Sequence, residues 1–348
     1  MSARRRLGRL VRTGSPRVVA RAVRRELLSR RHEAEVARAA REGRRLLVGP
    51  FLGEVGFELL YWIPLVRRLL AEHGVDRGRV TVLARGGSAS WYRDFADEAL
   101  DVLDLVPPDM FLEELVARRR RGGTTKQFFE DAFDAKLVRL AVERIGPAAV
   151  VHPLLMYSRM RFLWEGLLPP EQAPRLADYR PLEWEERPLP AGCPAEFAAV
   201  KFYFSDPFPD GDVSRGLAAR VLEELAERLD VVALTSGRQL DEHREWLPSG
   251  PRVHDAAAWV QPQDNLAIQT NLVARSRALV CTYGGFSYLG PMLGVPTLAL
   301  QVEEPDPYSS VHLAVVRAAF PTATYSVVGP DDLTSPASLS ERLAVLTS

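Results

Sequence analysis

The sequence predicts an α/β protein with two doubly wound domains, each built on a parallel sheet and facing the other across a cleft. Short apolar segments alternate with longer amphipathic ones, as expected for the strands and helices of parallel sheets. This alternation stops in a proline-rich stretch and begins again after it. A chain of 348 residues, 47% of them hydrophobic, is long enough to supply two packed cores of this kind.

The chain divides into four parts on this interpretation. Residues 1–45 form a basic leader that we expect to be helical, and 46–168 form an N-terminal Rossmann-like domain. Residues 169–197 contain seven prolines and no sustained apolar period, which suits a linker between domains. A second Rossmann-like domain takes 198–348.

The elements expected in the first domain follow one another in a regular order. A polar helix near 31–44 precedes a short strand in RRLLVGP. The order then continues with a helix over 56–73, a strand over 79–85, a helix or turn at WYRDFADEAL, a helix over 130–145 and a strand in AAVVHP.

The second domain repeats the same pattern. Its first three expected elements are a strand over 198–204, a helix over 214–229 and a strand over 230–236. After these come a helix opened by QPQDNL, a strand over 278–285, a helix in FSYLGPMLG and a strand over 295–302.

Charge is distributed unevenly along the chain. The leader holds 15 Arg, no Lys and four Glu, so its net charge is +11, and the remainder carries −11 because the total is zero. Apolar residues stand among these arginines at loosely helical spacing, which suits an anionic membrane surface. A solvated, Arg-rich tail or helix is an equal alternative. Nucleic acid is not an expected partner, since the leader has no aromatic residue and the rest is acidic.

The composition indicates the cellular compartment and bears on whether the protein binds a metal. The two cysteines, Cys193 and Cys281, lack metal-binding or CxxC spacing, which favours a reduced, cytoplasmic setting. We identify no secretory signal and no run that approaches the roughly 18–20 apolar residues of a membrane span. The acids Asp206, Asp210 and Asp212 lie in a proline-rich turn without a bidentate glutamate after it, so we predict no metal site.

The most specific motif is ALVCTYGGFSYLGPMLGVPTLAL. A buried strand runs into Thr282-Tyr283-Gly284-Gly285, and a helix begins near Phe286. Glycines there allow a ligand to approach the backbone, and free N–H groups at the helix start favour an anion such as a diphosphate. An ordinary strand–turn–helix unit is the alternative.

The block from Asp264-Asn265 through this motif resembles the C-terminal, nucleotide-sugar-binding half of GT-B glycosyltransferases, notably the heptosyltransferase-like families and the related epimerases. The resemblance covers roughly 198–302 and implies the GT-B fold, a nucleotide-diphosphate-sugar donor and catalysis without a bound metal or other cofactor. The Asp-Thr-Gly of heptosyltransferases is replaced here by Thr282-Tyr283-Gly284-Gly285. A heptose donor is therefore not implied.

Several residues are expected to hold the donor on this basis. Lys201, at the end of its strand, would neutralise donor phosphate. The segment Thr235-Ser236-Gly237-Arg238 either holds ribose, base or phosphate, or is a plain turn. The full set of expected donor residues is Lys201, Ser236, Gly237, Arg238, Asn265, Gln269, Tyr283, Gly284, Gly285 and Ser287.

The first βα turn, GPFLGEVGFE, is similar to the glycine-rich turn that faces the acceptor in GT-B proteins, so the resemblance implies the same role here. Sugar transfer needs a base for the acceptor hydroxyl, and we assign this role first to Glu54. Glu58 is a second catalytic candidate, or orients the turn from the start of a helix. The candidates for binding a phosphate on a lipid-linked acceptor are Tyr157, Arg159 and Arg161. The expected acceptor-binding residues are Gly53, Gly56, Arg85, Trp91, Tyr92 and His152.

Together these observations predict a cytoplasmic glycosyltransferase, inverting if its base is a carboxylate, peripheral on the inner membrane face, and acting on a cell-envelope glycan or lipid-linked acceptor. Two alternatives remain: a nucleotide-sugar 2-epimerase, and a non-catalytic nucleotide- or sugar-binding relative.

Overall fold

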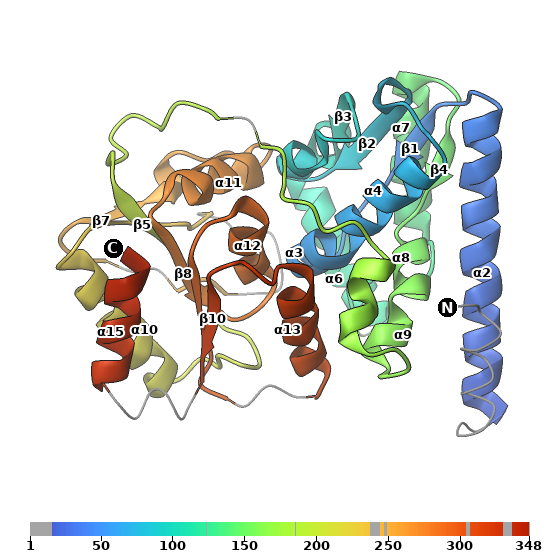
Figure 1. Ribbon diagram of the computed structural model, residues 1–348. Coiled ribbons are helices and arrows are strands. Elements are labelled where there is room, and N and C mark those ends of the chain that lie inside the picture. The colour runs from blue at the N-terminus through green and yellow to red at the C-terminus, as the bar shows by residue number, and fades with distance from the viewer. Residues whose placement is uncertain are drawn as a thin grey trace.

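The computed structural model describes residues 16–122, 124–184, 186–236, 244–246, 249–303, 307–329 and 336–347. Two separate parallel sheets organise these residues, and Figure 1 shows them side by side. Two Rossmann-like domains were expected from the sequence, and the topology confirms this fold class. None of the described helices combines the length and the apolarity needed to cross a membrane.

The first sheet has the strand order β3-β2-β1-β4, with every pairing parallel. Its strands are β1 (Leu46–Val48), β2 (Val80–Ala84), β3 (Glu98–Asp101) and β4 (Ala149–Val151). The helices and turns of this part are α2 (Pro16–Arg41), α3 (Val55–Phe57), η1 (Glu58–Trp62), α4 (Ile63–Glu72), η2 (Arg77–Arg79), η3 (Ser88–Tyr92), α5 (Val102–Leu105), α6 (Pro108–Gly122), α7 (Ala132–Ile145), α8 (Leu154–Arg159) and α9 (Arg161–Trp164).

The second sheet has the order β10-β9-β8-β5-β6-β7, again with parallel pairings. Its strands are β5 (Phe197–Lys201), β6 (Asp230–Ala233), β7 (Val253–Asp255), β8 (Ala278–Thr282), β9 (Thr297–Leu300) and β10 (Tyr325–Val328). The helices and turns are α10 (Asp212–Ala226), η5 (Ala256–Ala258), α11 (Asn265–Arg275), η6 (Gly285–Tyr288), α12 (Leu289–Leu293), α13 (Pro307–Ala319) and α15 (Pro336–Thr347).

The helix that follows β1 changes its winding where the sequence places a proline. It begins as α3, widens into the π-helical turn η1 and continues as α4. Pro64 has no N–H for the carbonyl four residues before it, and its ring crowds that carbonyl. The N–H of Ile63 instead bonds to the carbonyl of Glu58, five residues back. This widened turn carries Glu58 at the start of the helix.

The side chains of β5 alternate between two apolar clusters. Ala198 and Val200 pack with α10 and α15, whereas Phe197 and Ala199 belong to a cluster that continues into the other domain. The continuing cluster includes Leu46 and Val48 of the first sheet. The domains therefore share a large apolar interface, and the structure shows them packed together.

One expectation about an individual element was wrong. Residues 98–101, expected in a helix or turn, form β3, a half-exposed edge strand without apolar alternation. The polar helix expected near 31–44 is part of the longer helix α2. The expected linker contains η4 (Pro170–Arg175), and its residues Ala173, Leu176 and Leu182 are buried.

Candidate functional site

The turn after β1 and the turn after β8 meet at the domain interface, glycine against glycine. A Cβ atom on Gly56 would overlap the Cα of Gly285, and a Cβ on Gly285 would lie 2.5 Å from the backbone nitrogen of Gly56. The opposing atoms are backbone, so they have little freedom to move aside. Both turns follow the carboxyl ends of parallel strands, which is where doubly wound sheets bind ligands. This contact is the centre of the candidate site.

Glu54 lies on the first of these turns with an accessible carboxylate. Its backbone begins α3, but its side chain does not cap that helix. The carboxylate is 40% exposed, and Lys126 Nζ lies 3.7 Å from Oε1. The same ammonium lies 4.6 Å from the centre of the Phe57 ring. An exposed carboxylate fixed on a short turn has the accessibility that a general base needs.

Glu58 is fully buried and contacts other side chains of its own domain. One oxygen accepts hydrogen bonds from Ser88 (3.0 Å) and Tyr92 (2.6 Å), and the other lies 3.6 Å from Arg85. Burial raises the pKa of Glu58, while the nearby Arg85 opposes that rise. With no exposed atom, Glu58 has the geometry of a positioning residue.

Arg85 links this buried carboxylate to the turn that carries Glu54. Its side chain is 11% exposed, and its guanidinium donates a hydrogen bond to the carbonyl of Gly53. Glu58 thus holds Arg85, and Arg85 holds the backbone next to Glu54. The expected acceptor residues Arg85 and Tyr92 lie in this network, turned toward Glu58.

Gln127 braces the same turn from the opposite side. Its amide donates to the carbonyl of Pro50 (2.9 Å) and to Asp134 (2.9 Å), and it accepts from the backbone N–H of Leu52 (2.9 Å). The side chain is 1% exposed, so the bonds are protected from water. The sequence contained no local signal for its contact with this turn, because Leu52 and Pro50 lie 75 and 77 positions away.

Trp91 and His152 were expected to bind the acceptor, but both side chains contact other residues of the protein. Trp91 is 1% exposed, and its indole N–H donates to Thr270 in the other domain (2.8 Å). His152 is 4% exposed; its Nδ1 accepts from the N–H of Leu154 (3.1 Å), and Nε2 lies 3.6 Å from Asp134. Neither ring presents a face to a sugar in this conformation.

A second backbone contact joins the domains at the start of α11. The N–H of Leu266 donates to the carbonyl of Gly86 (2.8 Å), and a Cβ on Gly87 would lie 3.0 Å from the nitrogen of Ala267. The expected donor residues Asn265 and Gln269 lie on the same helix and are both buried, and the Gln269 amide donates to Asn265 (2.6 Å). The turn after β2 therefore packs against the start of α11.

Lys201 lies at the carboxyl end of β5 with partners from several segments. Its ammonium donates to the carbonyl of Leu234 (2.7 Å) and to Glu245 (2.7 Å), and lies 5.0 Å from the centre of the Phe286 ring. Ser236 donates to the other oxygen of Glu245 through its N–H (2.9 Å) and its hydroxyl (3.2 Å). The structure therefore brings Lys201 and Ser236 together around Glu245, which sequence reasoning missed because it lies in no recognisable motif.

The glycine turn after β8 is held by its own hydroxyl groups. Gly284 has φ +152°, and the Tyr203 hydroxyl occupies the position of a Cβ there, so a larger residue would be strained and crowded. Ser287 donates to the carbonyl of Gly284 (2.7 Å), and Tyr283 donates to that of Ser309 (2.8 Å). Tyr283 and Ser287 are both buried. Gly237 and Arg238 lie outside the described residues.

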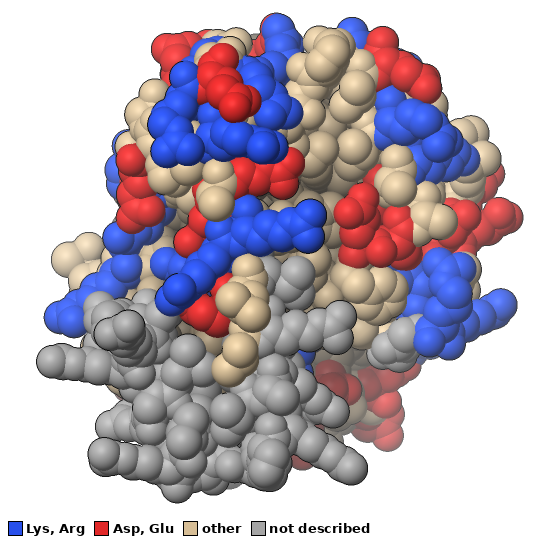
Figure 2. Space-filling view, turned by 90° about the vertical axis from the view of Figure 1, so that its right-hand side faces the viewer, with Lys and Arg blue, Asp and Glu red and all other residues tan. Residues whose placement is uncertain are grey.

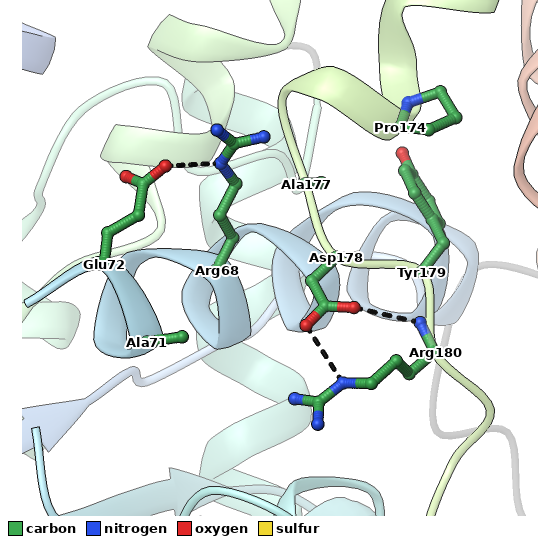
Figure 3. Close-up of a pocket in the computed structure, with 8 residues that line it drawn as sticks. All are labelled: Arg68, Ala71, Glu72, Pro174, Ala177, Asp178, Tyr179 and Arg180. Carbon is green, nitrogen blue, oxygen red and sulfur yellow. Dashed lines mark hydrogen bonds and ion pairs between the residues drawn. The ribbon is translucent and has the colours of Figure 1, made fainter. Parts of the chain in front are cut away.

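A separate open pocket of about 500 Å³ lies between α4 and the linker. Figure 3 shows that its charged side chains pair with one another: Arg68 with Glu72 at 2.6 Å, and Arg180 with Asp178 at 2.9 Å. None of the residues predicted to bind donor or acceptor lines it. Among the described residues, no group of three His, Cys, Asp or Glu is placed to hold a metal.

Two parallel α/β domains, with their strand-end turns in contact, form the two-domain architecture expected from the sequence. No model of a protein family and no curated protein matches the sequence. Among solved structures, ADP-heptose LPS heptosyltransferase II of E. coli is similar at 16% identity over 87% of this chain and 98% of that one, with a TM-score of 0.46. The family 9 glycosyl transferase of Veillonella parvula is similar at 14% identity over 83% and 86%, with a TM-score of 0.44. The E. coli heptosyltransferase WaaC with ADP is similar at 13% identity over 87% and 98%, with a TM-score of 0.43.

Proposed function

We propose that this protein is a glycosyltransferase that moves a sugar from a nucleotide-diphosphate donor to a hydroxyl of a glycan or lipid-linked acceptor without a bound metal. The observation that supports it most is the contact between the Glu54 turn and the glycine turn at Gly284 and Gly285. This contact brings an accessible carboxylate of one domain next to the glycine turn at a strand end of the other. Transfer between two bound substrates needs such a junction.

The proposed mechanism divides the work between the domains. The β8 turn and Lys201 would hold the donor diphosphate, and Glu54 would take the proton of the acceptor hydroxyl. As the hydroxyl oxygen attacks the anomeric carbon, the bond from that carbon to the phosphate oxygen breaks, and the nucleoside diphosphate leaves with the charge that Lys201 would balance. Direct attack with a carboxylate base inverts the anomeric configuration. Glu58 and Arg85 would keep the Glu54 turn in place through the Gly53 carbonyl.

A thermal-shift screen tests this proposal. The purified protein is heated with UDP, GDP, ADP, CMP, TDP and their sugars, with magnesium or with EDTA. A ligand that binds only the folded state raises Tm by mass action. We expect one nucleotide to raise Tm equally under both conditions. If no nucleotide shifts Tm at millimolar concentration, the proposal fails.

Replacing Lys201 with alanine is expected to weaken binding of the nucleotide found in that screen by about tenfold or more, because a charge-assisted hydrogen bond to phosphate is lost. Lys136→Ala is the matched control, since its ammonium lies beside the Met110 sulfur at an exposed position. Calorimetric titration of both variants measures the difference. Equal affinities for the two would contradict the role given to Lys201.

The proposal includes a membrane-facing surface on α2. The exposed positions described on this helix are Val23, Leu27, Arg30, Arg31, Ala34, Arg38 and Arg41. They recur every three or four residues, and none is acidic, whereas Glu26, Ser29, Val36 and Ala39 are buried. Figure 2 looks onto this side of the molecule and shows many Lys and Arg side chains above the grey residues. Such a face suits an anionic bilayer at the inner membrane surface of the cytoplasm.

Vesicle sedimentation measures this membrane contact. Arg31→Glu with Arg38→Glu is expected to lower binding to anionic phosphatidylglycerol vesicles by about tenfold or more, since each surface cation contributes about 1 kcal/mol. Arg228→Glu with Arg277→Glu changes the charge equally on the other domain and should bind nearly as the wild type. Equal losses in both variants would exclude a role for α2.

A further inference from the structure

Phe128 and Phe129 are the exposed aromatic side chains among the described residues. Phe128 is 36% exposed and Phe129 is 58% exposed, and they stand next to each other in the loop between α6 and α7. Adjacent phenylalanines in water leave a large apolar area uncovered. Exposed apolar groups beside polar ones commonly mark a binding surface.

The loop is rigidly attached next to the candidate base. Gln127, between the aromatic pair and Lys126, is the buried residue that braces Pro50 and Leu52. Lys126 in turn lies 3.7 Å from the Glu54 carboxylate. The exposed rings are therefore fixed beside the Glu54 turn, where an acceptor would be bound.

A cation adjoins the aromatic pair. The guanidinium carbon of Arg161 lies 5.2 Å from the centre of the Phe128 ring. The Tyr157 ring also contacts Phe128, with ring centres 5.0 Å apart. Arg161 uses its Nε to bond Glu165 (2.6 Å), and its terminal nitrogens bond none of the described residues. Arg161 is 32% exposed, so these donors are open to a ligand. Arg159, in contrast, pairs with Glu33 of α2 (2.6 Å).

We propose that Phe128, Phe129 and Arg161 bind an apolar chain that ends in a phosphate, of the isoprenyl phosphate type, as the anchored part of the acceptor. The rings cover the chain, and the Arg161 terminal nitrogens meet the phosphate, a geometry for which guanidinium is well suited. This inference rests on the proposed function, because it names the acceptor class of the same site. The hydroxyl to be glycosylated would belong to a sugar joined to that phosphate and would lie toward Glu54.

Titration with geranyl phosphate, a short soluble isoprenoid phosphate, tests the inference on the full chain. We expect saturable binding, detected by calorimetry, with geraniol and inorganic phosphate each binding at least about tenfold more weakly. Phe128→Ser with Phe129→Ser should reduce affinity by about tenfold or more, and Arg161→Gln should remove the preference for geranyl phosphate over geraniol.

Val213→Ser with Val345→Ser is the matched control, since these side chains are 71% and 75% exposed on the other domain. It should bind geranyl phosphate as the wild type does. The inference is overturned if geranyl phosphate does not bind, if inorganic phosphate binds equally well, or if the phenylalanine variant keeps wild-type affinity with unchanged Tm. The nucleotide titration is performed on the same variants. Nucleotide binding that persists while geranyl phosphate fails would refute this acceptor class and leave the donor proposal standing.

Discussion

Replacing Glu54 with glutamine is expected to lower kcat by about a hundredfold to ten-thousandfold, the usual contribution of a general base. Glutamine keeps the size of the side chain but cannot take a proton. The side chain is 40% exposed, and among the described residues its charged partner is Lys126 at 3.7 Å, so the substitution should leave Tm and nucleotide affinity nearly unchanged. Steady-state kinetics with the donor and acceptor of the wild type measure the effect.

Glu58→Gln distinguishes a residue that stabilises the fold from one that acts as the base. This carboxylate is buried against Arg85, Ser88 and Tyr92, so neutralising it leaves the Arg85 guanidinium without its charged partner. We expect Glu58→Gln to lower Tm, whereas Glu54→Gln does not. Full turnover by Glu54→Gln, or an equal loss of Tm in both variants, would contradict the assignment of Glu54 as the base.

Adding a single methyl group at Gly56 is expected to prevent the domains from packing as they do here. A Cβ at this position overlaps the Cα of Gly285, and backbone cannot rotate away as a side chain can. Gly56→Ala should lower kcat/KM by about tenfold or more and reduce Tm. Nucleotide affinity should fall less than kcat/KM, because the added Cβ meets Gly285 and Tyr288 rather than Lys201.

Gly216→Ala is the control for this substitution. Gly216 lies inside α10, and a Cβ there would meet nothing within 4 Å. Alanine should stabilise that helix by up to about 1 kcal/mol. Gly285→Ala should reproduce the Gly56→Ala phenotype, because its added Cβ would collide with the backbone of Gly56. Wild-type Tm and activity in both interface variants would show that the two turns do not need to touch.

The sequence predicted most of the fold because buried parallel strands are nearly continuous apolar runs. The segment ALVCT, for example, is buried at every position of β8. The edge strand β3 has the sequence EALD, with two exposed and two half-buried residues, so it lacks both that signal and regular alternation. Edge strands at β7 and β10 were missed for the same physical reason, since their residues are mostly half-buried.

The candidate site was predictable in its backbone but less so in its side chains. A glycine that follows a strand, such as Gly56 or Gly284, indicates that another group approaches the backbone closely. Whether Trp91 or His152 faces a ligand depends on partners far along the chain: Thr270 is 179 positions from Trp91. The same holds for Glu245, 44 positions from the lysine it pairs with. No local pattern encodes such contacts.

Hydrogen exchange with and without the nucleotide identified by the thermal screen locates the donor site. We expect bound nucleotide to protect the end of β5 at Lys201, the segment 234–236 and the β8 turn with η6. The Glu54 turn, which contacts that glycine turn, should be protected to a lesser degree. Protection confined to the pocket at Arg68 and Arg180, or no protection at the β8 turn under saturating nucleotide, would contradict the donor site proposed here.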